Sequence, residues 1–221
     1  MTIRALVFDL GGVILDSPMG ILEEFERKNG LSPGFINRLI VSRGEQGAWA
    51  RLERGGLNLG SFYEAFDKEL LAAGADISSR ELMEAINGFA SLRPRMIGAV
   101  RKIRRAGYLA AALTNNWLRG DGSTSTGMED LQKEFDVFVE SSRAGLAKPD
   151  PRIYGMVLAE LGVSAHEAVF LDDIGRNLKP ARQLGMETVR VDSEEGALSS
   201  LEELLGLDFG SGGSVQALAP F

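Results

Sequence analysis

Short runs of apolar residues recur along the chain, and each run ends at polar side chains. The runs cover residues 3–8, 108–113, 137–139, 168–171 and 188–191. Their apolar positions are consecutive rather than alternating, which is typical of strands buried on both faces of a parallel sheet. Helical segments, with an apolar period of about 3.6 residues, separate the later runs. This alternation predicts an α/β fold with a doubly wound, Rossmann-like parallel sheet.

The helices of this alternation carry start and stop signals. Asp150 followed by Pro151 predicts an N-cap and a first helical residue, and Gly162 marks the end of that helix. Three further helices are expected over residues 94–106, 177–184 and 194–205, and a glycine follows each of them.

Residues 18–92 interrupt the alternation, because they contain helical periods and no clear strand pattern. Ser61 with Glu64 and Ser78 with Glu81 have the spacing of capping boxes, which predicts two helix starts. We therefore expect a helical cap inserted after the first strand. The expected parts are a core of residues 1–17 and 93–207, a cap of residues 18–92, a mobile loop at 120–127 and a flexible tail at 208–221.

Composition narrows the classes of protein that fit. The 221 residues are 44% hydrophobic and 25% charged, as in ordinary globular domains. The chain has no cysteine and one histidine, so thiolate sites, disulfides and histidine metal clusters are excluded, and a Ser/His/Asp triad is disfavoured. The net charge of −7 disfavours nucleic-acid binding. The sequence shows no membrane span of about 20 apolar residues and no signal peptide, so we expect a cytoplasmic protein.

Polar residues with chemical potential follow four of the five apolar runs. They are Asp9, Thr114 with Asn115, Lys148, and Asp172 with Asp173. Because ligands bind at the carboxyl ends of parallel strands, we expect these residues to meet there. Three neighbouring carboxylates need a cation, and oxygen ligands favour Mg²⁺. A carboxylate beside Mg²⁺ and a lysine is a plausible nucleophile for phosphoryl transfer.

These residues stand in four motifs. The motifs are Phe8–Val13, Leu113–Asn115, Lys148–Pro149 and Phe170–Asp173. In this order they resemble the four motifs of the haloacid dehalogenase (HAD) superfamily, and the helical insert resembles that superfamily's first cap type, C1. Longer stretches around the motifs are similar to the amino-terminal phosphatase domain of soluble epoxide hydrolase and to the hydrolase-like domain of acyl-CoA dehydrogenase family member ten. The resemblance extends from Ile3 to about Leu207.

The resemblance implies a magnesium-dependent phosphatase that acts on a small organic phosphate. Asp9 would attack phosphorus and form an aspartyl-phosphate, which water would hydrolyse. The other implied catalytic residues are Lys148 and Thr114. The implied Mg²⁺ site consists of Asp9, the backbone carbonyl of Gly11, and Asp173, with Asp172 in support. The implied phosphate site consists of Thr114, Asn115 and Lys148, with Asn177 steadying its loop. Gly12 serves either a tight turn or, through its N–H, the phosphate.

Gly11 departs from the superfamily's pattern, because its phosphatases usually carry a second aspartate there as general acid and base. Such help is typically worth about 10²–10⁴-fold in rate. Three explanations stay open: a substrate with a good leaving group such as an acyl phosphate, another group or water as acid, or a slow enzyme. Two rival functions also remain, a dehalogenase, which needs no metal, and a non-catalytic binding or regulatory module. Trp49, Trp117 and Arg43 either line the pocket or serve packing and surface roles. Substrate identity and oligomeric state stay open.

Overall fold

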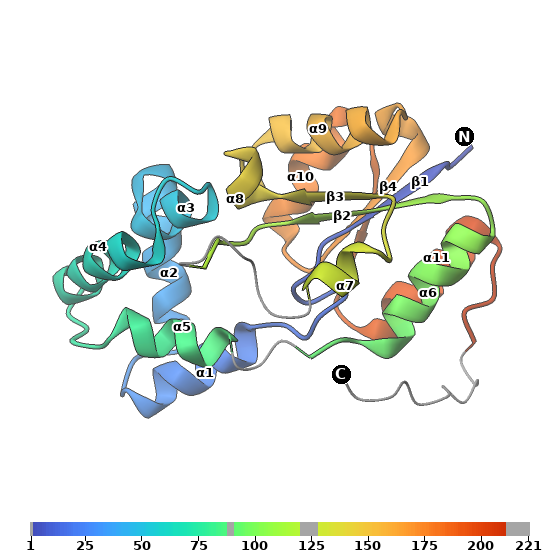
Figure 1. Cartoon of the computed structure of the whole chain (residues 1–221). Coiled ribbons are helices and arrows are strands. Elements are labelled where there is room, and N and C mark those ends of the chain that lie inside the picture. Colours follow the sequence, from blue (N-terminus) through green and yellow to red (C-terminus); the bar gives the residue numbers. More distant parts are fainter. Residues whose placement is uncertain (1, 88–90, 120–127, 211–221) are drawn as a thin grey trace.

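The structure, a computed structural model, describes residues 2–87, 91–119 and 128–210. Its centre is a sheet of five parallel strands in the order β3-β2-β1-β4-β5 (Figure 1). The strands are β1 (Ala5–Phe8), β2 (Leu109–Thr114), β3 (Val137–Glu140), β4 (Ala168–Asp172) and β5 (Glu187–Arg190). Each strand overlaps the apolar run that predicted it, and the α/β fold class is confirmed. The predicted loop at 120–127 lies outside the described residues.

Helices cover both faces of the sheet. One face carries α6 (Pro94–Arg105), α7 (Met128–Gln132) and α11 (Glu194–Leu205), and the other carries α9 (Pro151–Leu161) and α10 (Gly175–Leu184). The short helices α8 (Ser141–Ala144) and η2 (Ala165–Glu167) flank β3 and β4. Neighbouring residues of a strand point to opposite faces. Val7 accordingly packs with Tyr154 in one cluster, while Phe8 packs with Val100 in the other.

Most of the predicted helix signals hold in the structure. The Asp150 side chain accepts a hydrogen bond from the Arg152 N–H at the start of α9, and Gly162 ends that helix in the left-handed region. One capping prediction is wrong. Asn58 is the N-cap of helix α4 (Leu59–Ala72), and its side chain accepts the Ser61 N–H. Asn58 thus satisfies the donor one turn earlier, and Ser61 lies inside the helix.

Five α-helices between β1 and α6 form a layer at the carboxyl ends of the strands (Figure 1). They are α1 (Met19–Lys28), α2 (Phe35–Arg43), α3 (Ala48–Glu53), α4 and α5 (Ser79–Asn87), with the short helix η1 (Gly44–Gln46) between α2 and α3. We call residues 19–87 the helical cap. The cap has its own hydrophobic cluster, centred on the fully buried Phe62, Phe66 and Leu70 of α4. The cap therefore packs largely on itself and covers the carboxyl ends of the strands.

The two connections between the cap and the sheet run beside each other. The Asp16 N–H donates to the carbonyl of Ser91 at 2.9 Å, and the Arg93 N–H donates to the carbonyl of Ile14 at 2.9 Å. The chain thus leaves and re-enters the sheet layer at one place, close to the predicted boundaries at 17/18 and 92/93.

The chain beyond α11 stays in contact with the sheet layer as far as it is described. Phe209 packs against the hydrophobic core, its N–H donates to the Glu202 carboxylate, and Lys102 donates to the carbonyl of Asp208. Residues 208–210 are therefore held by the core, unlike the flexible tail expected from residue 208. A lone aromatic among polar residues and glycines gave no signal of this packing. Residues 211–221 lie outside the described part. None of the described helices has the length and apolar character to cross a membrane.

Candidate active site

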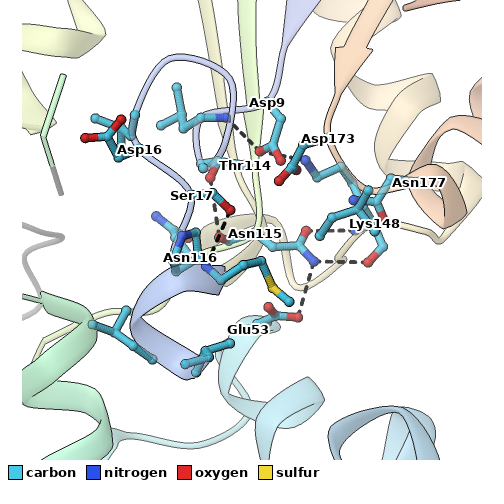
Figure 2. Close-up of a pocket in the computed structure, with 18 of the residues that line it drawn as sticks. Asp9, Asp16, Ser17, Glu53, Thr114, Asn115, Asn116, Lys148, Asp173 and Asn177 are labelled. Carbon is cyan, nitrogen blue, oxygen red and sulfur yellow. Dashed lines mark hydrogen bonds and ion pairs between the residues drawn. The ribbon is translucent and has the colours of Figure 1, made fainter. Parts of the chain in front are cut away.

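The order of the strands changes direction at β1, because β2 and β3 lie on one side of it and β4 and β5 on the other. In open α/β sheets, ligands bind at such a switch point, outside the carboxyl ends of the strands. Asp9 follows β1 at this point, Thr114 ends β2 and Asp172 ends β4. Lys148 reaches the same place from the loop between α8 and α9 (Figure 2). The structure thus brings the four predicted motifs together.

A cavity of about 240 Å³ lies between these strand ends and the helical cap. Seven of the predicted site residues line it, namely Asp9, Gly11, Thr114, Asn115, Lys148, Asp173 and Asn177. Gly12 and Asp172 stand behind this lining. Of the three residues with two open interpretations, Trp49 and Trp117 line the cavity and Arg43 does not. The cap adds mainly apolar side chains to the wall, including Ile21, Leu22 and Ile86.

Lys148 holds two carboxylates at the floor of the cavity. Its Nζ lies 2.7 Å from Oδ1 of Asp9 and 2.8 Å from Oδ2 of Asp172, and its side chain is only 1% exposed. Burial by itself would lower the pKa of Lys148, but the two carboxylates outweigh burial and raise it above its ordinary value. The ammonium therefore stays charged and fixes the position of Asp9.

The carboxylates of Asp9, Asp172 and Asp173 form a cluster, with one oxygen of each lying within 4.8 Å of the others. Burial, opposed by Lys148 and reinforced by Asp172, raises the pKa of Asp9 to about 7. Burial and the neighbouring Asp172 raise the pKa of Asp173 to about 6. One ammonium does not offset three carboxylates in a closed site, so the cluster favours either protons or a cation.

Asp172 and Asp173 differ in how far their oxygens are already used. The Asp172 carboxylate accepts hydrogen bonds from Lys148 and from the Ile174 N–H, and the Asn177 Nδ2 donates to both of its oxygens. Tyr154 in turn donates its hydroxyl to the carbonyl of Asn177 at 2.7 Å. By contrast, Oδ1 of Asp173 is buried and has no partner among the described residues. The donor set fits a hard divalent ion such as Mg²⁺, with Asp173 as a free ligand and Asp172 as support.

Gly11 and Gly12, which follow Asp9 in the same motif, differ in how much room their surroundings leave for a side chain. A Cβ atom on Gly12, whose φ is 75°, would lie 2.2 Å from Oδ2 of Asp173, so only glycine allows this approach. The Gly12 carbonyl accepts a hydrogen bond from Arg93 at 2.5 Å. Around Gly11, a Cβ would meet only Pro18, at 3.8 Å. A side chain at position 11 is therefore sterically tolerated, and its absence concerns chemistry rather than space.

Thr114 and Asn115 lie on the wall next to Asp9. The Asn115 amide group donates to Glu53 at 3.2 Å and to the carbonyl of Lys148 at 3.0 Å, and its Oδ1 accepts the Lys148 N–H. Both amide hydrogens are thus engaged, and the side chain braces the loop that carries Lys148. Thr114 is 5% exposed, and its hydroxyl donates to the carbonyl of Asn115 in a long bond of 3.3 Å. Of the two side chains, the Thr114 hydroxyl is the freer to turn toward a ligand.

A family model of the haloacid dehalogenase-like hydrolases matches residues 3–185. The chain belongs to this family. It is 36% identical over 206 residues to acyl-CoA dehydrogenase family member 10 of Mus musculus, covering 92% of this chain and 19% of that protein. It is 33% identical over 219 residues to bifunctional epoxide hydrolase 2 of Sus scrofa, covering 94% and 40%. The chain thus spans less than half of these two relatives, and the predicted resemblance to both is confirmed.

Two further likenesses extend over the full length of the similar protein. A phosphatase of Mycobacterium tuberculosis, MT3486, is 29% identical over 231 residues, covering 96% of this chain and all of that protein. A HAD-like hydrolase of Porphyromonas gingivalis superimposes with a TM-score of 0.67 at 23% identity, covering 94% of this chain and all of that one. The sequence relatives include phosphatases, and the structural likeness shows the HAD fold.

Glu53, at the end of α3, is a polar cavity residue of this HAD-like hydrolase that sequence analysis missed. Its Oε1 accepts the Trp49 indole N–H at 3.1 Å, and its Oε2 accepts an amide hydrogen of Asn115 at 3.2 Å (Figure 2). Burial raises the pKa of Glu53 above its ordinary value, against the Trp49 hydrogen bond and the charge of Arg176. Arg176 also lines the cavity. The sequence offered only the four-residue spacing of Trp49 and Glu53, which is common on helices.

Proposed function

We propose that this hydrolase is a magnesium-dependent phosphatase that cleaves a small organic phosphate through a phosphoaspartyl intermediate on Asp9. The observation that carries the proposal is the Asp9 carboxylate, which Lys148 holds beside Asp172 and Asp173 on the floor of the cavity. The M. tuberculosis phosphatase among the relatives supports the phosphatase activity. The acidic pair favours this function over a dehalogenase, which has no need of a metal site.

Asp9 is prepared to act as the nucleophile. Its Oδ1 accepts hydrogen bonds from Lys148 and from the Leu10 N–H, both at 2.7 Å. The described residues give its Oδ2 no such donor, so Oδ2 is the oxygen that attacks phosphorus. Asp9 must be ionised for this attack, whereas burial raises its pKa to about 7. Positive charge in the site therefore determines how much of the nucleophile is active at neutral pH.

Asp9, the backbone carbonyl of Gly11, and Asp173 would hold Mg²⁺, with Asp172 as support. When bound, the ion supplies positive charge that keeps these carboxylates ionised and neutralises the phosphoryl oxygens. Lys148 adds a second positive charge in contact with Asp9 and Asp172. The Thr114 hydroxyl and the backbone N–H groups at Gly12 and Asn115 would donate to the remaining phosphoryl oxygens, while the Asn177 side chain keeps Asp172 in place.

The cavity limits the organic part of the substrate. Its volume of about 240 Å³ lies below the range of roughly 300–1,000 Å³ for pockets of drug-sized ligands. The wall away from Asp9 consists mainly of cap side chains such as Leu22, Trp49 and Ile86. We therefore expect a compact substrate with an apolar group beside its phosphate.

The test is phosphate release from acetyl, 4-nitrophenyl and butyl phosphate, with Mg²⁺ and with a chelator. We expect Mg²⁺-dependent release that Asp9→Asn abolishes and that Asp76→Asn, at an exposed position of the cap, leaves unchanged. Full activity of Asp9→Asn, or activity equal with and without Mg²⁺, would contradict the proposal. Halide release from 2-chloropropionate without metal, and no phosphate release, would assign the chain to the dehalogenases instead.

A further inference from the structure

The proposed reaction lacks a proton donor, because Gly11 stands where a second aspartate would serve. Among the residues that the structure describes, four line the cavity with a carboxyl group, namely Asp9, Asp16, Glu53 and Asp173. Asp9 is the nucleophile, and Asp173 belongs to the metal site. Asp16 forms an ion pair with Arg93, and its side chain is 43% exposed. Glu53 is the carboxyl group that remains without another task.

We propose that Glu53 of the helical cap is the general acid and base of this enzyme, in place of the missing aspartate; this rests on the phosphatase function proposed above. As Oδ2 of Asp9 bonds to phosphorus and the bond from phosphorus to the leaving oxygen breaks, the Glu53 carboxyl proton moves to that oxygen. The alcohol leaves, and Glu53 becomes a carboxylate. Water then attacks the phosphoaspartyl phosphorus, Glu53 takes the water proton, and inorganic phosphate and the free Asp9 carboxylate result.

The position of Glu53 suits this task. It reaches the cavity from the cap, across from the strand ends that hold Asp9 (Figure 2). The Trp49 and Asn115 N–H groups each occupy one lone pair of its carboxyl oxygens. A carboxyl group has about four such positions, so these two hydrogen bonds leave a place for the acid proton. The Asn115 amide group also donates to the carbonyl of Lys148, so one side chain fixes the positions of both the Lys148 loop and Glu53.

The electrostatics of the closed cavity also favour the protonated form. Burial raises the pKa of Glu53, while Arg176 on α10 and Lys148 are the charged groups that oppose this. A phosphate anion in the cavity repels a second negative charge, which raises the proton affinity of Glu53 further. An ionised Glu53 would hinder substrate binding, whereas a neutral one both tolerates the anion and donates to the leaving oxygen.

The test compares leaving groups in Glu53→Gln, a variant that keeps the size of the side chain but has no transferable proton. We expect butyl phosphate hydrolysis to fall by about 10²-fold or more. In the first turnover, before water attacks the intermediate, acetate release from acetyl phosphate should lose less than about threefold, because its leaving group is stable as an anion and needs no acid. Glu64→Gln, the same change at an exposed site on α4, should leave both rates unchanged. Adding Gly11→Asp to Glu53→Gln should restore butyl phosphate hydrolysis, because position 11 has room for a side chain.

Equal first-turnover losses for both substrates in Glu53→Gln, measured before the intermediate is hydrolysed, would show that Glu53 only positions the cap and would overturn the inference. So would a wild-type enzyme that cleaves acetyl phosphate but not butyl phosphate, although the phosphatase function would stand. Absence of release from every phosphate would refute the phosphatase function itself. If Glu53→Gln fails to fold, Trp49→Phe provides a second test. Loss of the indole N–H should raise the pKa of Glu53 and shift the alkaline limb of the pH–rate profile for butyl phosphate to higher pH. An alkaline limb at the wild-type pH would contradict the inference.

Discussion

Asp9→Asn should change how the stability of the metal-free protein depends on pH. Burial holds the pKa of Asp9 at about 7 in the folded protein, against an ordinary value of 3.8. The folded state therefore binds a proton that the unfolded state has lost, and folding stability falls as pH rises through this range. Each pH unit in which the two states differ by one proton corresponds to about 1.36 kcal/mol.

Over the interval from pH 5.5 to pH 8, Asp9 carries its extra proton in the folded state only up to its pKa of about 7. The two states therefore differ by one proton over about 1.5 pH units. The Asp9 contribution to the loss is then about 2 kcal/mol. Asp173, with a pKa of about 6, adds a smaller loss of the same sign that remains in the variant. The unfolding free energy of Asp9→Asn minus that of wild type should thus be about 2 kcal/mol larger at pH 8 than at pH 5.5.

Urea unfolding with a chelator at both pH values measures this difference. The control is Asp76→Asn, which removes a carboxylate from an exposed position and should keep the wild-type pH dependence. The reasoning would be refuted if Asp9→Asn lost as much stability between the two pH values as wild type does. That result would mean that Asp9 is ionised throughout the range and that Lys148 alone compensates the carboxylate cluster.

Three further predictions follow from the same site. Gly12→Ala should displace Asp173 and weaken Mg²⁺ binding, measured by calorimetry, by roughly 10–100-fold. The control is Gly74→Ala, at a position with φ of 86° and open space around it; it should cost about 1–2 kcal/mol of stability and leave Mg²⁺ binding unchanged. Lys148→Gln should destabilise the protein by about 3–5 kcal/mol at pH 8 in urea unfolding, because it leaves two buried carboxylates unpaired; a loss below about 1 kcal/mol would contradict this. Mg²⁺ at a hundredfold its Kd should stabilise the wild type by about 2.7 kcal/mol, and a thermal-shift assay should show a clearly smaller gain for Asp173→Asn.

The sheet and the four motifs were predictable because local signals determine them. Consecutive apolar residues marked β1 to β4, whereas β5 is partly exposed and its run at 188–191 contains Arg190. Asp150 with Pro151 marked the start of α9, where the structure has it. Asp9 and the Asp172–Asp173 pair follow strands directly, so the topology of a parallel sheet was enough to bring them together. The capping signal at Ser61 misled because Asn58, three residues earlier, caps α4 by accepting the Ser61 N–H, which places Ser61 inside the helix.

Glu53 was not predictable in the same way, because its role depends on how the cap packs on the core. Along the sequence it is a charged residue near the end of a short helix. In the structure its backbone carbonyl accepts the Ser141 hydroxyl at 2.6 Å, and its carboxyl group meets Asn115. These contacts join segments that lie far apart in the chain. No local pattern encodes them, and the same applies to the packing of Phe209 on the core.

The central claim is that Asp9 carries the phosphoryl group during turnover. The most direct measurement is mass spectrometry of protein mixed with acetyl phosphate and Mg²⁺ and quenched in acid within the first turnover. The account predicts one phosphoryl group on the peptide that contains Asp9, and none in Asp9→Asn. Phosphate release without that adduct in the first turnover, or with the phosphoryl group on another residue, would contradict it.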